Sequence, residues 1–409
     1  MRRYDVAIIG AGLAGLAAAC AFALAQYDVI LLERQSQLRP INKGELLQPR
    51  TLAILHEWNM LEELFAQSPL RIKTLGSYDA RGHLLGLFDY HTLKNTPYNY
   101  ALIHYYPVIR QVFVNHIQHR VELQMGTHID QIMPHDDYAL VAGHNREGDV
   151  KIAASLIVVA DGRHSAIRER YFQPTGKLAN YAHRFLGLDL DSDFHFAPGQ
   201  IMTYLTRHGA RIWYPMPGGG SRLYIQVPVS PVPWIRSPSE IEATLRCDTP
   251  GLPLPSHWAD TIRSRQSFKV WRYLAPTWIQ SNMILIGDAA HISHPIAGQG
   301  MNAAIEDAWW LVTTCKRYHL QPSHQIPLAL QTYEQTRRPQ VHHVLRISHR
   351  LSLICTATSW PRRSLARYML RANHNNGRLK YKALLGIAGL HRPRLRFRDL
   401  LPFRSGDIS

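Results

Sequence analysis

The sequence predicts an α/β protein in which a Rossmann-like parallel sheet carries an inserted antiparallel sheet and is followed by a helical C-terminus. Uninterrupted apolar strands joined by an Ala/Leu-rich helix open the chain. Alternating apolar and polar residues mark its middle, and a basic pattern with helical spacing marks its end. A chain of 409 residues is long enough for two or three packed units.

The first unit begins with a strand, a helix and a second strand. Tyr4–Ile9 and Val29–Leu32 are short apolar runs, and Leu13–Ala25 between them is rich in Ala and Leu. Continuous apolar strands joined by a helix pair in parallel and are covered on both faces. Further elements expected in this unit are helices over 48–65, 107–118 and 301–315 and buried strands over 154–160 and 283–286.

The middle of the chain has a different pattern. Apolar and polar residues alternate in Gly209–Tyr214 and Leu223–Val227, and Pro217-Gly-Gly-Gly supplies a turn. This pattern favours an antiparallel sheet inserted into the first unit. The expected organisation is a discontinuous domain over 1–172 and 276–350, with part of 70–100 adding to the inserted sheet, a substrate-binding domain over 173–275, and a basic helical region over 351–409. Helix boundaries are expected at Pro339, Pro361 and Pro393.

Charge is distributed unevenly. The chain carries 46 Lys and Arg against 30 Asp and Glu, a formal charge of +16. From Arg337 to Ser409 there are 16 basic and 2 acidic residues, so this segment holds +14 of the total. A body that is nearly neutral argues against a general polyanion-binding protein, and we expect no nucleic-acid partner.

Cysteines and the N-terminus indicate the compartment. The four cysteines are scattered, which excludes a disulfide scaffold or a Cys-rich zinc module and suits a reducing environment. Asp5 and the glycines at 10, 12 and 15 interrupt the apolar N-terminal stretch, so we expect neither a signal peptide nor a membrane-spanning helix. The expected location is cytoplasmic.

A glycine motif lies between the first strand and helix, with the sequence Gly10-Ala11-Gly12-Leu13-Ala14-Gly15. Gly10 permits the tight turn, Gly12 lets the backbone approach a pyrophosphate, and Gly15 lets helix and strand pack closely. The helix N-terminus offers unpaired N–H groups and a positive dipole end to phosphate. The motif in this context predicts a dinucleotide site.

Glu33 ends the second strand, where a carboxylate accepts hydrogen bonds from ribose hydroxyls. The same carboxylate repels a 2′-phosphate, so the site is expected to hold NAD or the ADP half of FAD. This motif alone does not choose between the two.

A second motif near the other end of the chain bears on that choice. Gly287-Asp288-Ala289-Ala290-His291 is followed by Pro295 and by Gly298-Gln299-Gly300-Met301-Asn302, between a buried strand and a helix. Asp288 is placed to bond a sugar-alcohol hydroxyl, and the next helix N-terminus to face a second anionic or carbonyl-rich group. Two such contacts indicate an extended ligand, a dinucleotide plus a ring.

These motifs resemble those of the single-component FAD-dependent aromatic hydroxylases, the para-hydroxybenzoate hydroxylase type of class A flavoprotein monooxygenase. The resemblance rests on the glycine motif with Glu33-Arg34, on Asp161-Gly162 after a buried strand, and on Gly287-Asp288 with its G-Q-G-M-N tail. Arg110, within the helix expected over 107–118, resembles the flavin-contacting arginine of that family. The match extends over roughly residues 1 to 350.

The resemblance implies FAD as cofactor, NADH or NADPH as transient reductant, and O2 as co-substrate. A flavin C4a-hydroperoxide would hydroxylate or epoxidise an apolar aromatic or polyprenyl-like substrate, so the difficult chemistry belongs to the flavin and no protein side chain is named as catalytic. The resemblance places the segment from Pro295 to Asn302 beside the flavin ring, with backbone N–H groups of Gly300, Met301 and Asn302 near the reduced flavin. Asp288 would hold the ribityl chain, and Asp161 would couple the flavin and nicotinamide functions.

A shorter resemblance covers Gly44-Glu45-Leu46-Leu47-Gln48-Pro49, which is similar to a stretch of squalene epoxidases, proteins that share this fold. Several hydroxylases carry a basic residue two places before that glycine, where this chain has Asn42. Lys43 and Arg39 are the nearby cations, and the sequence leaves open which side chain meets the nicotinamide phosphates.

The aromatic residues Trp213, Tyr214 and Tyr224 of the inserted sheet are candidates for the wall of the substrate pocket. Two alternatives stay open from the sequence: a flavin-dependent reductase of isoprenoid double bonds, and a non-catalytic flavin-bound binding protein. Among the 23 histidines, the pairs His291/His294 and His342/His343 lack carboxylates or cysteines at ligand spacing, so no metal is expected.

The C-terminal region is basic and partly amphipathic. Arg363, Arg367 and Arg371 recur every four residues, and arginines at 392, 394, 396 and 398 alternate with other residues. Basic residues interleaved with apolar ones are attracted to an anionic bilayer. The pattern predicts either a peripheral contact with the inner face of the cell membrane or an acidic protein partner.

Overall fold

The computed structural model describes residues 2–38, 45–94, 96–191, 199–229, 237–252, 254–255, 257–318 and 325–390. Lys43, Pro393 and the arginines from 392 to 398 lie outside these residues, so the predictions made for them are not addressed by the structure.

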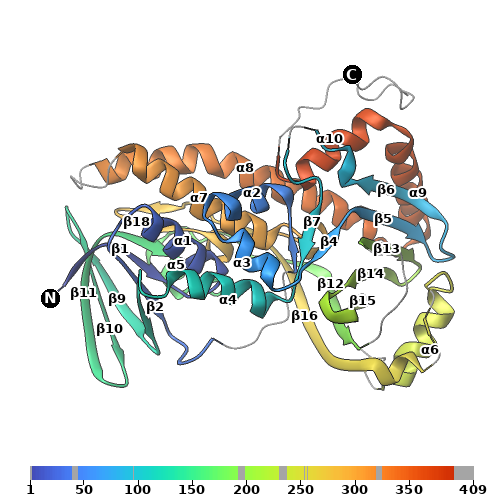
Figure 1. Ribbon diagram of the computed structural model, residues 1–409, viewed down its shortest axis with the longest axis horizontal. Helices are drawn as coiled ribbons and strands as arrows, with labels where there is room; N and C mark the ends of the chain where they lie inside the picture. Colours follow the sequence, from blue (N-terminus) through green and yellow to red (C-terminus); the bar gives the residue numbers. More distant parts are fainter. Residues whose placement is uncertain are drawn as a thin grey trace.

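A parallel sheet forms the first layer (Figure 1). Its parallel strands lie in the order β18-β11-β1-β2-β8, and the hairpin β9–β10 extends from β11. The strands β1 and β11 are almost entirely buried where they pair, as the uninterrupted apolar runs predict. The bounds are β1 (Arg3–Ile9), β2 (Val29–Glu33), β8 (Glu122–Met125), β9 (His128–Pro134), β10 (Ala139–Asn145), β11 (Gly148–Val159), β17 (Ile279–Gln280) and β18 (Met283–Leu285).

Helix α1 (Leu13–Leu24) lies at the centre of this layer. Every residue from Leu13 to Phe22 is buried, because α1 packs on β1 and β2 and contacts both α4 (Tyr106–Ile117) and α7 (Gly300–Tyr318). A helix that is apolar on all sides is stable only in such an enclosed position. The segments from the two ends of the chain therefore share one core.

Two expected helix limits were wrong. The helix expected over 48–65 is two helices, α2 (Pro49–Glu57) and α3 (Leu61–Ala66), because Asn59 between them has a φ of 57°. Pro339 does not end a helix but lies inside α8 (Ile326–Cys355). The buried residues Tyr333, Arg337, Val341 and Leu345 recur every four positions across Pro339, so tertiary packing holds the helix on both sides of it.

A second sheet has the order β19-β16-β12-β15-β14-β13-β5-β6 and is antiparallel except for the β13–β5 pair. Two of its strands come from 74–89, early in the chain. The bounds are β5 (Thr74–Asp79), β6 (Leu84–Asp89), β12 (Ala179–Leu190), β13 (Gln200–Thr206), β14 (Gly209–Pro215), β15 (Ser221–Pro228), β16 (Ile262–Leu274) and β19 (His291–Ile292). A small sheet of β3 (Leu46–Leu47), β7 (Ala101–Ile103) and β4 (Leu70–Ile72) lies between the layers.

The two faces of the second sheet bury different clusters. One face packs Trp213 and Leu188 against Ile241 of α6 (Pro238–Asp248). The other buries Phe185, Ile212 and a set that extends to the last helix. Because successive strand residues point to opposite faces, Ile212 and Trp213 belong to different clusters.

The chain ends in two helices, α9 (Trp360–Asn375) and α10 (Gly377–Ile387), which lie beside β5 and β6 (Figure 1). Ala366 and Leu370 of α9 pack with Leu85 of β6. The predicted α/β class with an antiparallel sheet and a helical C-terminus is confirmed. Within the part of the chain that the structure describes, no helix combines the length and apolar character needed to cross a membrane. All four cysteines are free thiols.

Candidate active site

The glycine motif forms a turn that tolerates no side chain at two of its three glycines. Gly10 has a φ of 103°, and a Cβ there would lie 2.5 Å from the carbonyl oxygen of Ala160. A Cβ on Gly15 would lie 1.8 Å from the carbonyl oxygen of Gly10. By contrast, a Cβ on Gly12 would meet nothing within 4 Å, so Gly12 faces open space.

That open space lies in front of the N-terminus of α1. Gly12 is the N-cap and provides no side-chain cap, and the first turn, which begins with Leu13 and Ala14, contains no acidic residue. The unpaired N–H groups and the positive end of the helix dipole are therefore left for an external anion. This is the arrangement that a pyrophosphate requires.

Glu33 is held beside the turn at the end of β2. Its Oε2 accepts the Ala11 N–H at 2.7 Å, and its Oε1 accepts the Gln35 N–H at 2.9 Å. The carboxylate thus orients the backbone of the glycine turn as well as facing the expected ribose. Arg34, which follows it, is exposed.

The second motif meets the first. Gly287 has a φ of 59°, and a Cβ on it would lie 2.6 Å from the Cβ of Ala14. The half-buried Asp288 follows at the end of β18, two strands from β1 in the sheet. Residues more than 270 positions apart are thus adjacent, so one extended ligand is able to contact both motifs.

Asp161 follows the buried strand β11, next to Gly10. Burial raises the pKa of its carboxyl, although hydrogen bonds from the Ser165 side chain and the Ile167 backbone act in the opposite direction. Its Oδ1 is buried and has no hydrogen-bond partner among the described residues. An unsatisfied buried acceptor costs free energy that a bound ligand would recover.

Two residues of α4 border the phosphate end. The hydroxyl of Tyr106 has a hydrogen bond with the backbone of Leu13, and burial raises its pKa. The guanidinium of Arg110 lies 5.8 Å from the centre of the Tyr106 ring and donates from Nη2 to the carbonyl of Leu38 at 3.2 Å. The sequence named Arg110 but gave no signal for Tyr106.

The expected ring-side loop, from Pro295 to Asn302, is fastened by one side chain. Oδ1 of Asn302 accepts the N–H of Gln48 at 2.8 Å, and its Nδ2 donates to the carbonyls of Leu46 and Gly298 at 2.8 and 2.7 Å. This amide ties the segment similar to squalene epoxidases to the loop, leaving the backbone N–H groups at the start of α7 for a ligand. Pro295 and Gly300 are exposed, and Met301 is partly buried.

A buried ionic network that sequence reasoning missed supports the second motif. Oδ2 of Asp307 accepts the N–H of Gly287 at 2.9 Å and bonds Nε2 of His291 at 2.6 Å, while its Oδ1 accepts from Nε of Arg337 at 2.8 Å. Burial opposes ionisation of Asp307, but His291 and Arg337 outweigh it and lower its pKa. The network fixes the position of the Gly287 turn.

A second missed network joins the small sheet to the large one. Glu45 directly precedes β3, and its Oε1 accepts hydrogen bonds from Arg222 and from the Tyr224 hydroxyl. Arg222 also bonds Asp189. Burial and the Glu45 carboxylate raise the pKa of Tyr224 well above its usual value.

An apolar cavity of about 80 Å³ lies against the loop at Ile296, Ala297 and Gly298. Other residues of its wall are Leu75, Phe88, Ile212, Tyr214 and Leu351. Tyr214 lines this cavity. Trp213 does not, because it belongs to the opposite face of the sheet, and Tyr224, whose hydroxyl bonds Glu45, is not among the lining residues.

Two buried histidines connect the loop to the second sheet. His183 of β12 and His294, which precedes Pro295, have their Nε2 atoms 3.0 Å apart. The Nδ1 of His294 accepts the N–H of Ile296 at 3.2 Å, so its Nε2 carries the proton donated to His183. Burial lowers the pKa of His183 to about 4 and that of His294 to about 2.

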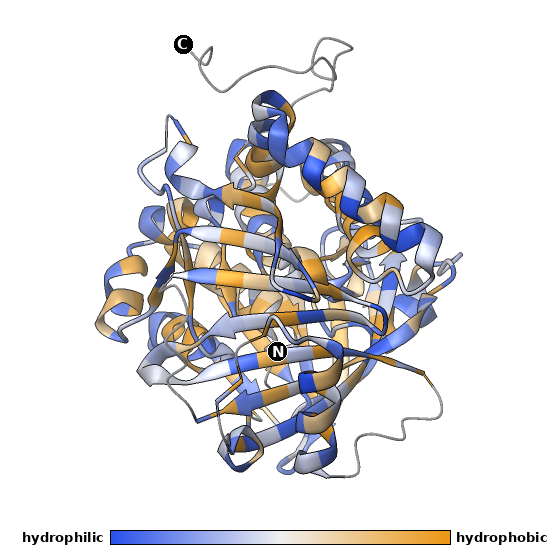
Figure 2. Cartoon of the chain, turned by 90° about the vertical axis from the view of Figure 1, so that its right-hand side faces the viewer, coloured by the Kyte–Doolittle hydropathy of each residue, from blue (hydrophilic) through white to orange (hydrophobic). Residues whose placement is uncertain are grey.

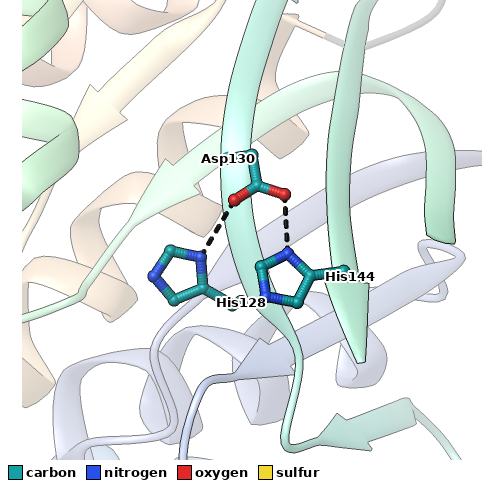
Figure 3. A group of neighbouring side chains, drawn as sticks. All are labelled: His128, Asp130 and His144. Carbon is teal, nitrogen blue, oxygen red and sulfur yellow. Dashed lines mark hydrogen bonds and ion pairs between the residues drawn. The ribbon is translucent and has the colours of Figure 1, made fainter. Parts of the chain in front are cut away.

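A separate polar group lies on the hairpin β9–β10 (Figure 3). Asp130 bonds His144 at 2.8 Å and His128 at 3.2 Å, and these side chains are exposed. Their ligand atoms lie within 4.8 Å of one another. The trio belongs to a different part of the first sheet from the glycine motifs, and none of its residues lines the apolar cavity.

The residues present fit FAD. Open space at Gly12, an uncapped helix N-terminus, the unpartnered Oδ1 of Asp161 and the carboxylate of Glu33 form one continuous polar border. The Gly287 corner adjoins this border, and an apolar cavity lies beyond the loop. A dinucleotide with a ring at its far end requires this combination.

Comparisons with known proteins agree with this geometry. The sequence model of the family described as "FAD binding domain" matches residues 3–348. The chain belongs to this family. FAD is its cofactor, and the protein is an FAD-dependent monooxygenase, so the predicted resemblance to the aromatic hydroxylases is confirmed.

Relatives of known activity cover most of the chain. Protoasukamycin 4-monooxygenase of Streptomyces nodosus subsp. asukaensis is 26% identical over 389 residues, covering 87% of this chain and 89% of the relative. Squalene epoxidase erg1 of Schizosaccharomyces pombe is 25% identical, covering 75% and 68%. The crystal structure of p-nitrophenol 4-monooxygenase PnpA from Pseudomonas putida DLL-E4 has a similar fold, with a TM-score of 0.82 at 20% identity over 97% of this chain and 100% of that one.

Replacing Glu33 tests the ribose end. Glu33→Ala should weaken FAD retention by about 1.5–3 kcal/mol, because it removes a charged hydrogen-bond acceptor. Glu33→Gln keeps an acceptor for the Ala11 N–H and should retain more flavin. Flavin absorbance after dilution and gel filtration measures both. Full flavin occupancy in the alanine variant would contradict the assignment.

Replacing Asp307 tests the support of the Gly287 turn. Asp307→Asn should lower the free energy of unfolding by about 3–5 kcal/mol, because it removes the buried negative charge that Arg337 and His291 share. Glu306→Gln is the matched control: Glu306 also bonds Arg337 but is less buried, so its loss should cost less. Urea denaturation of the flavin-loaded proteins measures the difference, and equal losses would contradict the role of Asp307.

The histidine pair predicts acid sensitivity. His183 is neutral when folded and has a pKa of about 4, below the unfolded value near 6.5, so the unfolded state binds the extra proton between these values. Stability is therefore lost as the pH falls from about 6.5 to 4, by no more than about 3 kcal/mol for this group. His183→Phe should flatten the dependence of the free energy of unfolding on pH over that interval. Exposed His135→Phe is the control, and identical curves for wild type and His183→Phe would refute the prediction.

Proposed function

We propose that this monooxygenase uses NAD(P)H and O2 to hydroxylate, or to epoxidise, an apolar aromatic or polyprenyl-like substrate. The observation that carries the proposal is the apolar cavity that lies between the second sheet and the loop at Ile296–Gly298. FAD, when bound, supplies the transfer of electrons from the nicotinamide and the activation of oxygen. The chain itself binds FAD and the substrate, orients them, and excludes water.

The glycine turn and α1 hold the pyrophosphate in this proposal, and Glu33 holds the ribose. Asp288 holds the ribityl chain at the corner beside Ala14. The loop from Pro295 to Asn302 then borders the ring, and its backbone N–H groups favour negative charge there. Asn302 fixes this loop through its hydrogen bonds to Leu46 and Gly298.

The cavity wall excludes water and sets the substrate class. Leu75, Phe88, Ile212 and Leu351 give it an apolar surface, and the Tyr214 side chain contributes an aromatic ring. Apolar enclosure protects a reactive oxygen donor from proton leakage and favours a greasy substrate. The names of the relatives agree with this class, since they act on protoasukamycin, squalene and p-nitrophenol.

Helix α10 covers one side of the cavity through Ile387. Its C-terminal end is held by two hydrogen bonds: Gln299 Nε2 donates to the carbonyl of Ile387 at 2.7 Å, and the Arg50 N–H donates to the carbonyl of Ala388 at 3.1 Å. A volume of about 80 Å³ is well below the roughly 300–1,000 Å³ of typical ligand pockets. A substrate of several rings therefore requires the cavity to widen.

The division of the chain belongs to the same proposal: residues 1–172 and 276–350 bind FAD, and 173–275 bind substrate together with strands from 70–100.

We also propose that the region from 351 contacts an anionic membrane surface at the inner face of the cell membrane. Support comes from the absence of any Asp or Glu between 335 and 390, against seven Lys and Arg from 351 to 390.

The reaction is tested by measuring NAD(P)H oxidation and O2 uptake with phenols, quinolones and polyprenylated rings. A substrate should stimulate both, and its product should gain one oxygen atom by mass. Leu351→Trp fills the cavity and should lower the stimulated rate about tenfold or more, the equivalent of 1.4 kcal/mol. Leu328→Trp is the matched control, since Leu328 lies on the same helix and is exposed.

The outcomes separate the alternatives. NAD(P)H oxidation without stoichiometric O2 uptake indicates a reductase, and no turnover with any of these substrates indicates a non-catalytic flavoprotein. Equal loss of stimulation in the Leu328 and Leu351 variants would contradict the assignment of the cavity.

A further inference from the structure

The trio of His128, Asp130 and His144 on the hairpin β9–β10 takes no part in the cofactor border or the apolar cavity. Figure 3 shows both imidazole rings turned toward the same carboxylate. Nδ1 of His144 lies 2.8 Å from Oδ2 of Asp130, and Nδ1 of His128 lies 3.2 Å from its Oδ1. Three side chains that bind metals in other proteins thus converge on one point of the surface.

The pairing of the two strands brings the histidines together. His128 pairs directly with His144 in the antiparallel ladder, so both side chains leave the sheet on the same face. The two rings are stacked, with their centres 5.2 Å apart and an angle of 28° between their planes. The spacing of the imidazoles is therefore set by the backbone hydrogen bonds of the hairpin.

A β-bulge supplies the carboxylate. The register of β9 against β10 shifts between Ala142 and Gly143, and it leaves Asp130 as an extra residue without a partner in the ladder. A bulge re-aims the side chains of its strand, and this one directs Asp130 at the two imidazoles (Figure 3). Gly143 is required here, because a Cβ on it would lie 2.1 Å from the carbonyl oxygen of His128.

Helix α5 (Ala166–Tyr171) holds this part of β9 from the side. Nη1 of Arg170 donates to the backbone carbonyl of Asp130 at 2.5 Å, and the Tyr171 hydroxyl accepts the N–H of Ile132 at 2.8 Å. Among the described residues β9 pairs only with β10, so these contacts support an edge strand. The backbone that carries the trio is fixed before any ligand binds, which reduces the entropy lost on binding.

Two imidazole nitrogens and one carboxylate oxygen are a suitable ligand set for a divalent transition metal. Zn²⁺ takes histidine nitrogen at about 2.0–2.1 Å and carboxylate oxygen at about 2.0–2.2 Å, and with three protein ligands it keeps a fourth position for water. Tetrahedral bonds of this length separate the ligand atoms by about 3.3 Å. The nitrogen–oxygen distances of 2.8 and 3.2 Å in the trio are close to this value.

Coordination requires only a change of tautomer in each ring. Each Nδ1 would give its lone pair to the metal, and the proton of the neutral imidazole would reside on Nε2. The side chains of His128 and His144 are 60% and 57% exposed, so the Nε2 N–H groups are able to donate to water. Hard cations such as Mg²⁺ prefer oxygen ligands and suit this set poorly.

The basic C-terminal helices lie far from this hairpin. Figure 1 places β9 and β10 at the opposite end of the molecule from α9 and α10. Figure 2, which faces that other end, shows hydrophilic and hydrophobic residues interleaved on the C-terminal helices. Near the trio, Asp149 of β11 pairs with His144 and adds a carboxylate to the same face of the sheet. The excess charge of the C-terminal region therefore does not oppose a cation here.

We propose that His128, Asp130 and His144 bind a divalent transition metal ion, of which Zn²⁺ suits the ligand set best, with water in the fourth position. The ion would join the edge strand β9 to β10. The prediction of no metal rested on histidines that are close in sequence, whereas this trio is assembled across two strands. The proposal does not depend on the monooxygenase reaction, because the trio lies outside the cofactor border and the cavity.

Calorimetry with Zn²⁺ on the tag-free, FAD-loaded protein, after treatment with a chelator, tests the site. The wild type should bind one equivalent of Zn²⁺ and should bind Mg²⁺ far more weakly. His128→Asn, Asp130→Asn and His144→Asn should each weaken Zn²⁺ binding about tenfold or more, because each removes one of three protein ligands. His135→Asn and Asp136→Asn, in the exposed turn of the same hairpin, are matched controls and should change it less than twofold.

Two measurements locate the bound ion. X-ray absorption at the zinc edge should show two imidazole nitrogens at about 2.0–2.1 Å. Hydrogen exchange of the amides in β9 and β10 should slow by up to about a hundredfold at a free Zn²⁺ concentration about 100 times its Kd, because the ion binds only the closed hairpin. Exchange in β8, at the other edge of the sheet, is the internal reference and should not change.

Several results would overturn the proposal: no equivalent of Zn²⁺ bound, Mg²⁺ bound equally well, or equal losses of affinity in the trio and control variants. Zinc coordinated by fewer than two imidazoles would also overturn it and assign the ion to other side chains. The flavin content of each variant should equal that of the wild type, because the trio does not border the cofactor. Loss of Zn²⁺ binding with full flavin content supports the site.

Discussion

The close approach of two glycine corners is the constraint on which the rest of this structure depends. Gly10 and Gly15 allow β1, β11 and α1 to pack without a side chain between them, and Gly287 packs directly on Ala14. Backbone contact at these points brings the N-terminal turn and the distant second motif to one border. An extended cofactor is then able to span both, with its charged end at a helix N-terminus and its ring toward an apolar cavity.

Buried charges hold the segments that this constraint brings together. Asp307 and Arg337 fix the Gly287 turn, and Arg222 joins Glu45 of the small sheet to the large one. Buried ion pairs add little net stability, since desolvation offsets much of their attraction. Their value here is positional: each carboxylate accepts several donors from elements far apart in sequence, which leaves one arrangement of the loops that satisfies them all.

The C-terminal helices serve two surfaces at once. Their inner residues close the cavity beside the flavin loop, while α9 presents arginines and large apolar side chains outward. Within the described residues, Arg362, Arg367 and Arg371 of α9 are exposed.

The sequence by itself determined the class of fold, the order of the first strand, helix and strand, and the two glycine motifs. These depend on local periodicity and on positions that only glycine is able to occupy. The tertiary structure decided the rest. Packing carries α8 through Pro339, and the alternation of β14 turns Trp213 away from the cavity that Tyr214 lines. The partners of Asp307, Glu45 and His183 come from distant segments, so no spacing in the sequence predicts them. Local chemistry is encoded within a few residues, whereas side-chain pairing across the core exists only once the chain has folded.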